Sequence, residues 1–242
     1  MSEVRTMKFV AFLVAMIGLS SHAGAGVLLT NGGFETGDLT GWTTVDAGSG
    51  SIDVISGVTP GNSGNFPTAG PSSGSFYAVT SQNGPGTHAL LQSFTVAGPI
   101  STAELTFDMF VQTESTAIVD PAGLDHTGNP NQHARVDILT GTAAALDTGA
   151  GVLFNFYTGI DGFPTQPYTS YTFDITALVG GGGTFQLRFA QSDNLGFFNL
   201  GVDNVQITTS SVGTVPEPSS IVIFSAIGLG VFGLRRRNGK VA

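Results

Sequence analysis

The stretch AELTFDMFV, residues 103–111, alternates apolar and polar side chains along the chain. Its odd-numbered positions from 105 to 111 are apolar and its even-numbered positions from 104 to 108 are polar, with Phe110 as the exception. Successive side chains of an extended strand point to opposite faces, so a period of two puts one set in a core and the other in solvent. The stretch therefore predicts a β-strand that is buried on one face.

The same alternation recurs downstream, with turn-forming residues between the runs. Four further stretches show it: ARVDILT (134–140), YTFDIT (171–176), TFQLRFA (184–190) and LGVDNVQIT (200–208). Glycine, proline and polar residues dominate the connections, and we expect long loops at 56–75, 119–133 and 155–171. Many short strands without interleaved helical periods predict an all-β fold, an antiparallel jelly-roll-like β-sandwich.

Basic residues are scarce in the middle of the chain. Between Gly26 and Pro218 only Arg135 and Arg188 are basic, whereas all but one (Glu3) of the 17 acidic residues lie there, which gives two positive and sixteen negative charges and a formal charge of −14. Such a surface repels phosphates and anionic membranes, which excludes nucleic-acid binding. The chain also lacks cysteine, so core packing, with or without a bound metal, must hold the domain together.

The start of the chain has the pattern of a secretory signal peptide. Arg5 and Lys8 precede an apolar run, and small residues follow it, with cleavage expected after Ala25. Met7 is an alternative start that gives a more compact basic segment. We therefore expect residues 1–25 to be a signal peptide and residues 26–211 to be the exported sandwich.

Two motifs at the ends of the exported part carry a family resemblance. Asn31-Gly-Gly-Phe-Glu35, followed by Gly41-Trp42, resembles the opening of jelly-roll carbohydrate-binding modules and related extracellular sandwiches. The stretch FFNLGVDNVQI, residues 197–207, resembles their last strand. The resemblance implies the jelly-roll fold and, in many members, a structural calcium ion where the first and last strands meet. We expect Phe34 and Trp42 to be core residues rather than sugar platforms.

The same motifs suggest where that calcium ion would lie. Gly32 and Gly33 permit a tight backbone path that can turn carbonyl oxygens toward one point. Glu35 and Asp203 would then approach each other and repel without a counter-ion, and Ca²⁺ accepts about six to eight oxygen ligands in flexible geometry. We predict a structural Ca²⁺ held by Asn31, Glu35 and Asp203, with ordinary solvated surface acids as the alternative.

One predicted loop carries residues that could serve a metal hydrolase: Asp120, Asp125, His126 and His133. Their spacing does not fit a His-Glu-x-x-His zinc helix, and no third-ligand motif is visible. A polar exposed loop is the simpler interpretation. The sequence therefore predicts that the protein is not an enzyme, with a hydrolase acting on matrix polysaccharide as the alternative.

Exposed aromatic side chains often mark sugar-binding surfaces, but no motif places one in this sequence. The candidates are Phe154, Phe156, Tyr157, Phe163, Tyr168, Phe197 and Phe198. We expect most of them to be core residues or loop anchors, so the sequence alone assigns no sugar site.

The C-terminus combines a short motif, an apolar run and a basic cluster. Val215-Pro216-Glu217-Pro218 precedes the apolar residues 221–234, and Arg235, Arg236 and Arg237 follow. This order resembles the PEP-CTERM sorting signal of Gram-negative bacteria. The resemblance implies recognition by an exosortase, which is a membrane transpeptidase, and removal of the tail; a permanent anchor is the alternative.

The physical chemistry of the tail agrees with this resemblance. Fourteen helical residues span about 21 Å, which is short of a hydrocarbon core of about 30 Å. The arginines would stay in the cytoplasm by the positive-inside rule. We expect a linker at 212–220, a transmembrane helix at 221–234 and a cytoplasmic tail at 235–242.

These observations predict an exported protein of a Gram-negative bacterium. It would cross the inner membrane, remain anchored there for a time, and then reach the cell surface or the extracellular matrix. Its role would be that of a non-catalytic matrix or surface component associated with exopolysaccharide.

Overall fold

A computed structural model describes residues 25–60, 66–82, 84–120, 123–163 and 165–211. Gly24–Val212 forms a compact unit, and all the strands described belong to it. Because both sheets and their core lie inside this unit, we treat residues 24–212 as the folding domain. The predicted signal peptide and sorting tail lie outside the described residues, apart from Ala25, with which the first strand begins.

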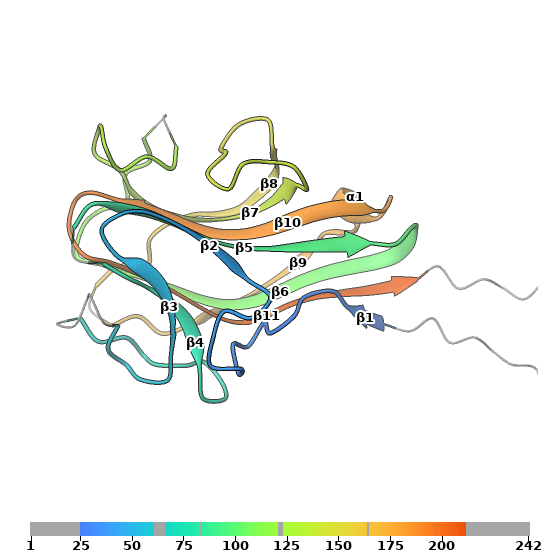
Figure 1. Cartoon of the computed structure of the whole chain (residues 1–242), viewed down its shortest axis with the longest axis horizontal. Coiled ribbons are helices and arrows are strands. Elements are labelled where there is room, and N and C mark those ends of the chain that lie inside the picture. The colour runs from blue at the N-terminus through green and yellow to red at the C-terminus, as the bar shows by residue number, and fades with distance from the viewer. Residues whose placement is uncertain (1–24, 61–65, 83, 121–122, 164, 212–242) are drawn as a thin grey trace, which may run out of the picture. The chain divides into compact units, whose positions relative to one another are not determined.

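Two antiparallel sheets pack face to face, as the sequence predicts (Figure 1). Sheet A has the order β3 (Ser51–Ile55), β4 (Tyr77–Ser81), β11 (Phe198–Ser211), β6 (Ile100–Thr113) and β9 (Thr169–Asp174), with β1 (Ala25–Val27) also paired to β11. Sheet B has the order β2 (Thr43–Gly48), β5 (Gly86–Val96), β10 (Gly183–Asp193), β7 (Gln132–Thr140) and β8 (Val152–Gly159). One short helix, α1 (Thr176–Val179), is the helix that the described residues contain. Most neighbours within a sheet are distant in sequence, which is the arrangement of a jelly roll.

The core lies between the sheets and uses the predicted apolar faces. The four apolar side chains at the odd-numbered positions of β6 from 105 to 111 are at most 1% exposed. The ring of Phe107 meets Phe189 of β10 edge to face, with centroids 5.1 Å apart, so the two sheets interdigitate. Phe34 and Trp42 are also buried, with ring centroids 5.5 Å apart, which confirms the prediction that they are core residues.

Phe110 breaks the alternation because the outer face of sheet A is covered as well. It is fully buried with Tyr77 and Val79, and Tyr168 packs edge-on against it at 5.0 Å. Gly201 on the neighbouring strand leaves room for its ring, since a Cβ at this position would lie 2.0 Å from Phe110 Cε1. An apolar residue at a nominally solvated position therefore marks a second, smaller core.

The outer face of sheet B is covered in the same way. Leu124 packs with Ala89 and Ala190 of the sheet, and the segment 141–151 adds further apolar side chains. The two covering loops also meet each other, because a Cβ at Gly123 would lie 2.3 Å from Thr148 Oγ1. Loops thus bury apolar parts of both outer faces.

The predicted loop at 155–171 is wrong at both ends and correct in its middle. It contains the end of β8 and the start of β9, and only residues 160–168 connect them. The pairing of β7 with β8 is irregular between Val136 and Asp137, which leaves an extra residue on β8. This bulge breaks the two-residue period, so the strand could not be recognised from alternation.

Candidate functional site

A pocket of about 300 Å³ opens at the end of the sandwich where β10 connects to β11. It is lined by Phe66, Gly84, Pro85, Glu114, Asn194, Gly196 and Phe197. Its volume is at the lower end of the range for small-molecule sites, about 300–1,000 Å³. The lining comes from four separate segments of the chain, so neither Phe66, Glu114 nor Asn194 carried a sequence signal for it.

Aromatic rings form the apolar side of the pocket. Phe66 and Phe197 stack face to face, with centroids 3.7 Å apart and an interplanar angle of 3°. Phe163 packs edge-on against both rings, at 6.3 Å and 5.9 Å, and is itself 53% exposed. Phe163 and Phe197 were candidate sugar platforms, and the structure brings them together. Phe197 is 6% exposed and stacked on Phe66, so Phe66 and Phe163 present the ring surface that the apolar face of a sugar could contact.

Two polar side chains complete the lining, and they differ in their freedom. Asn194 is held in place, because its Nδ2 donates to the carbonyl of Asn129 (2.8 Å) and its Oδ1 accepts from the N–H of Asn131 (2.8 Å). Glu114 is exposed and forms none of the ion pairs found among the described residues. Its carboxylate lies over Gly196, where a Cβ would come 3.5 Å from Oε1.

A buried polar layer adjoins the pocket. Gln82 Nε2 donates to Asp193 Oδ1 and to the carbonyl of Gly84, which is part of the lining. Gln191 Nε2 donates to Gln82 Oε1, and Thr80 Oγ1 donates to Gln191 Oε1. Asp193 is fully buried and its Oδ2 accepts no hydrogen bond. Burial raises the pKa of Asp193 to about 8, so this carboxyl is mostly protonated at neutral pH.

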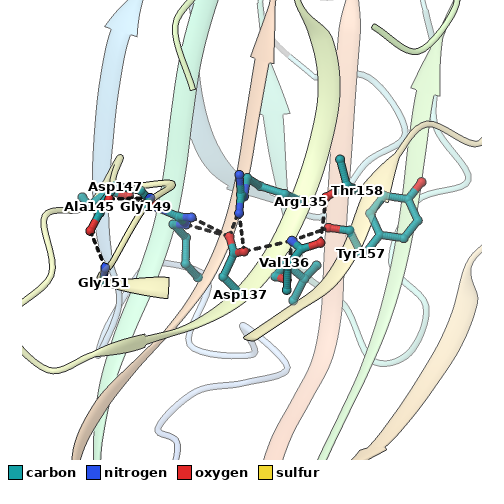
Figure 2. A network of polar contacts seen from close by, with 11 residues as sticks. Arg135, Val136, Asp137, Ala145, Asp147, Gly149, Gly151, Tyr157 and Thr158 are labelled. Atoms are coloured by element: carbon teal, nitrogen blue, oxygen red, sulfur yellow. Dashed lines mark hydrogen bonds and ion pairs between the residues drawn. The ribbon is translucent and has the colours of Figure 1, made fainter. Parts of the chain in front are cut away.

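Both arginines of the domain pair with one aspartate on the outer face of sheet B (Figure 2). Arg135 contacts both carboxylate oxygens of Asp137, at 2.7 and 2.8 Å. Arg188 contacts Oδ2 at 2.6 and 3.0 Å and donates to the carbonyls of Ala145 and Asp147, both at 2.7 Å. These bonds fasten the loop that carries Ala145 and Asp147 to the sheet.

The arginine pair has a consequence for the surface charge. The side chain of Arg188 is 0% exposed and that of Arg135 is 10% exposed. The described part of the chain contains no lysine. Over these residues, the exposed fixed charges are therefore almost all carboxylates.

Two of the predicted calcium residues, Glu35 and Asp203, lie near each other, and backbone amides donate hydrogen bonds to their carboxylates. A Cβ at Gly33 would lie 3.8 Å from Glu35 Cγ and 3.9 Å from Asp203 Oδ1. Glu35 Oε1 accepts hydrogen bonds from two N–H groups of loop 72–76, at 2.9 and 3.0 Å. Asp203 Oδ2 accepts from two other N–H groups of this loop, at 2.9 and 3.1 Å. These hydrogen bonds relieve the repulsion between the Glu35 and Asp203 carboxylates, which the sequence alone suggested that a cation would relieve.

The third predicted ligand, Asn31, organises a turn. Its backbone has a positive φ of 52°, and its Nδ2 donates to the carbonyls of Asp38 (3.0 Å) and Thr40 (3.3 Å). Burial raises the pKa of Asp203, which is 0% exposed, whereas Glu35 is exposed. Within the described residues, no group of three or more His, Cys, Asp or Glu side chains could hold a metal ion. A calcium ion at Glu35 and Asp203 would have to share their oxygens with the amides.

The residues that suggested a metal hydrolase have structural contacts instead of a common centre. His126 Nδ1 contacts Thr87 Oγ1 at 3.1 Å, and Asp125 Oδ1 accepts from the N–H of Thr127 at 2.8 Å. His133 Nδ1 contacts Asn131 Oδ1 at 2.8 Å. Burial, and then the charge of the neighbouring arginine, lower the pKa of His133 to about 4, so it is neutral at physiological pH.

Two predictions from the sequence are wrong in this part of the molecule. The loop is not simply polar and exposed, because Asp120 and His133 are buried. The interpretation that the chain has no Gly-x-Ser-x-Gly nucleophile turn is also wrong, because GPSSG, residues 70–74, has this spacing. It lies in a loop, and Ser72 Oγ donates to Asp108 Oδ2 at 2.7 Å rather than to a histidine.

The remaining aromatic candidates lie away from the pocket. Phe154, Phe156 and Tyr157 lie on β8, and Phe156 packs on Phe173 of β9 with centroids 4.8 Å apart. Phe198 is fully buried in the core, and Tyr168 belongs to the second core on sheet A. Phe154 is 50% exposed, which makes it a match in exposure for Phe163.

Comparison with known families identifies the tail. Residues 214–237 match the family model described as the PEP-CTERM protein-sorting motif. The chain therefore carries this motif, as the sequence predicted, although these residues lie outside the described structure. No helix that the structure describes is long and apolar enough to cross a membrane. None of the curated proteins matches the chain.

Solved structures share the fold at low sequence identity. A structure of TmCBM61 in complex with β-1,4-galactotriose is 12% identical, with 75% of this chain and 97% of that chain covered and a TM-score of 0.45. The K3 cleaved adhesin domain of Lys-gingipain from Porphyromonas gingivalis is 18% identical, with 76% and 99% covered and a TM-score of 0.49. The CBM22-1 xylan-binding domain from Paenibacillus barcinonensis Xyn10C is 14% identical, with 79% and 99% covered and a TM-score of 0.43. With TM-scores below 0.5, these likenesses add nothing to the fold, which the order of the strands in the two sheets establishes.

Proposed function

We propose that this chain is an exported surface protein whose sandwich domain binds a glycan without turnover. The PEP-CTERM motif implies export and sorting by an exosortase. On this proposal, the mature protein of a Gram-negative bacterium becomes part of the cell surface or of an exopolysaccharide matrix. The domain would tie the protein to that polysaccharide.

The pocket lined by Phe66 and Phe197 is the observation that carries the binding function. It combines a flat apolar wall with a free carboxylate and a fixed amide, which is the mixture that small-molecule sites use for affinity and orientation. Its position also suits this role. The pocket lies at the start of β11, and the residues of the sorting tail follow the end of this strand in the sequence. A strand of 14 residues is about 45 Å long, so the pocket and the end of β11 are about that far apart.

Binding of the purified domain, residues 24–212, to soluble polysaccharides tests the proposal. Replacing Phe66 or Phe163 by alanine should weaken binding by roughly 2- to 10-fold, since aromatic contacts contribute about 0.5–1.5 kcal/mol beyond their buried area. Phe154→Ala is the matched control for Phe163→Ala, because its ring is about as exposed but packs on Phe156 of β8, whereas Phe163 packs on the pocket residues Phe66 and Phe197. Equal losses in all three variants would show that the pocket is not the binding site.

The same preparation separates binding from hydrolysis. We expect the polysaccharide to be recovered intact after long incubation, as judged by its size distribution and by reducing ends. Release of products that is lost on replacing Asp120 or Asp125 by asparagine would instead support a hydrolase acting through the loop at 119–133.

A structural calcium ion is a separate proposal. It is supported by the approach of Glu35 and Asp203 to Gly33 and by the excess of carboxylates over exposed cations. The ion would add ligands where the first loop meets the last strand, and it would stabilise the domain rather than take part in chemistry. The binding of both carboxylates by amides is the observation that weighs against it.

A further inference from the structure

Among the described residues that line the pocket, one carries a negative charge and none a positive one. Glu114 is the single ionisable side chain of these residues, which include no Arg, Lys or His. The three ion pairs of the described residues use His88, Arg135 and Arg188, and none of them involves Glu114. The arginines are committed to Asp137 and to a loop, so neither can turn toward the pocket without breaking this network.

We propose that the pocket takes sugars that carry no negative charge and that it prefers a free amino sugar to its N-acetylated form. The proposal rests on the glycan-binding function proposed above and names the chemical class of the ligand. A uronate carboxylate in the pocket would meet Glu114 without a basic side chain to pair with it. A protonated amino group would meet a carboxylate that has no competing cation.

The geometry of the lining favours Glu114 as the group that interacts with the charge of the ligand. Gly196 has no side chain, and the Glu114 carboxylate lies over it, so a ligand can reach the carboxylate at this point. Asn194 is neutral and is held in place by the segment 129–131 at both ends of its side chain, so it does not discriminate between charged ligands. The stacked rings of Phe66 and Phe197 supply apolar contact that does not depend on ligand charge.

Calorimetric titration of the domain with three matched ligands tests the proposal. The ligands are glucosamine oligomers, the same oligomers fully N-acetylated, and uronic acid oligomers of equal length, at mildly acidic pH and at low and moderate salt. We expect glucosamine oligomers to bind most tightly and uronic acid oligomers least. Glu114→Gln should weaken binding of the glucosamine oligomers by about 1.5- to 5-fold, the effect of one solvated ion pair, and leave the N-acetylated oligomers unchanged.

Glu104→Gln is the control for the overall negative charge. Glu104 is an exposed acid of β6 that does not line the pocket, so its replacement changes the net charge equally. Equal weakening by both variants would mean that the glucosamine oligomers bind to the acidic surface in general, which overturns the proposal.

The three ligands also distinguish failure of the charge preference from failure of the glycan-binding function. Tight binding of uronic acid oligomers that is sensitive to Phe66→Ala would overturn the charge preference while leaving the glycan-binding function in place. Absence of binding by all three ligands would overturn both. A preference for glucosamine that disappears in Glu114→Gln but persists in Glu104→Gln supports the assignment.

Discussion

Replacing Asp193 by asparagine should stabilise the domain, and increasingly so as pH rises. Asp193 is fully buried at the end of β10, and its pKa is about 8 instead of the ordinary 3.8, because burial disfavours the charged form. Between these two pH values the unfolded chain has lost this proton and the folded domain retains it. The free energy of unfolding therefore falls as pH rises through this range, because only the unfolded chain carries the ionised carboxylate.

The size of the effect follows from the separation of the two pKa values. A separation of about four units at about 1.4 kcal/mol each gives a cost of about 5–6 kcal/mol above pH 8, and none below pH 4. Asparagine is neutral throughout, and its Oδ1 can still accept the hydrogen bond from Gln82. Its amide nitrogen would take the place of Oδ2, which accepts no hydrogen bond.

Urea denaturation of both proteins from pH 4 to pH 9 measures the difference. The two stabilities should converge near pH 4, and the variant should gain by at most 1.4 kcal/mol per unit until pH 8, where the gap becomes constant. Asp174→Asn is a control of opposite sign, since hydrogen bonds from Thr176 lower the pKa of this exposed acid. Parallel pH profiles for the wild type and Asp193→Asn would refute the interpretation of Asp193 as a buried, protonated carboxyl.

Three further predictions concern the tail, the calcium ion and the arginine pair. Mass spectrometry of the protein from its host should find a C-terminus at or near Pro216-Glu217-Pro218, and a mature chain that still ends at Ala242 would contradict exosortase processing. If calcium binds the folded domain, replacing EGTA by Ca²⁺ at a hundred times its Kd should raise the free energy of unfolding by about 2.7 kcal/mol and raise the melting temperature accordingly, and Asp203→Ala should abolish that difference. Identical melting curves with EGTA and with Ca²⁺, starting from metal-free domain, would show that no calcium ion binds at these carboxylates. Asp137→Ala leaves two guanidinium groups without their carboxylate, so chemical denaturation should show a loss of about 3–5 kcal/mol, and a loss below 1 kcal/mol would mean that solvent already reaches the pair.

The parts of this fold that could be predicted are those encoded in local patterns. The alternation at 103–111 identified a core strand, and the segment from Asn31 to Trp42 correctly predicted two buried aromatic rings. The sorting motif was recognisable because its three parts are consecutive in the chain. In each of these cases, residues that are close together in the sequence are sufficient to predict the structure or the motif.

The candidate site could not be predicted because its parts are distant in sequence. Phe66 and Phe197 stack because the loop before β4 runs back to the start of β11, where Asn199 Nδ2 donates to the carbonyl of Phe66. The pairing of Arg188 with Asp137 likewise depends on register, since the two residues lie directly opposite each other on β10 and β7. The irregular pairing of β8 hid a strand for the converse reason, because an extra residue at each of two register shifts removes the period that identifies a strand.

The burial of both arginines also makes the folded domain resistant to secreted proteases that cleave after arginine or lysine. Enzymes that cleave after arginine or lysine need an extended, accessible segment with such a residue, and in the described residues both arginines lie within paired strands and no lysine occurs. The folded domain therefore offers trypsin-like enzymes no accessible cleavage site in these residues, whereas the unfolded chain offers two. An enzyme of this specificity would remove misfolded copies of the domain and spare the folded ones.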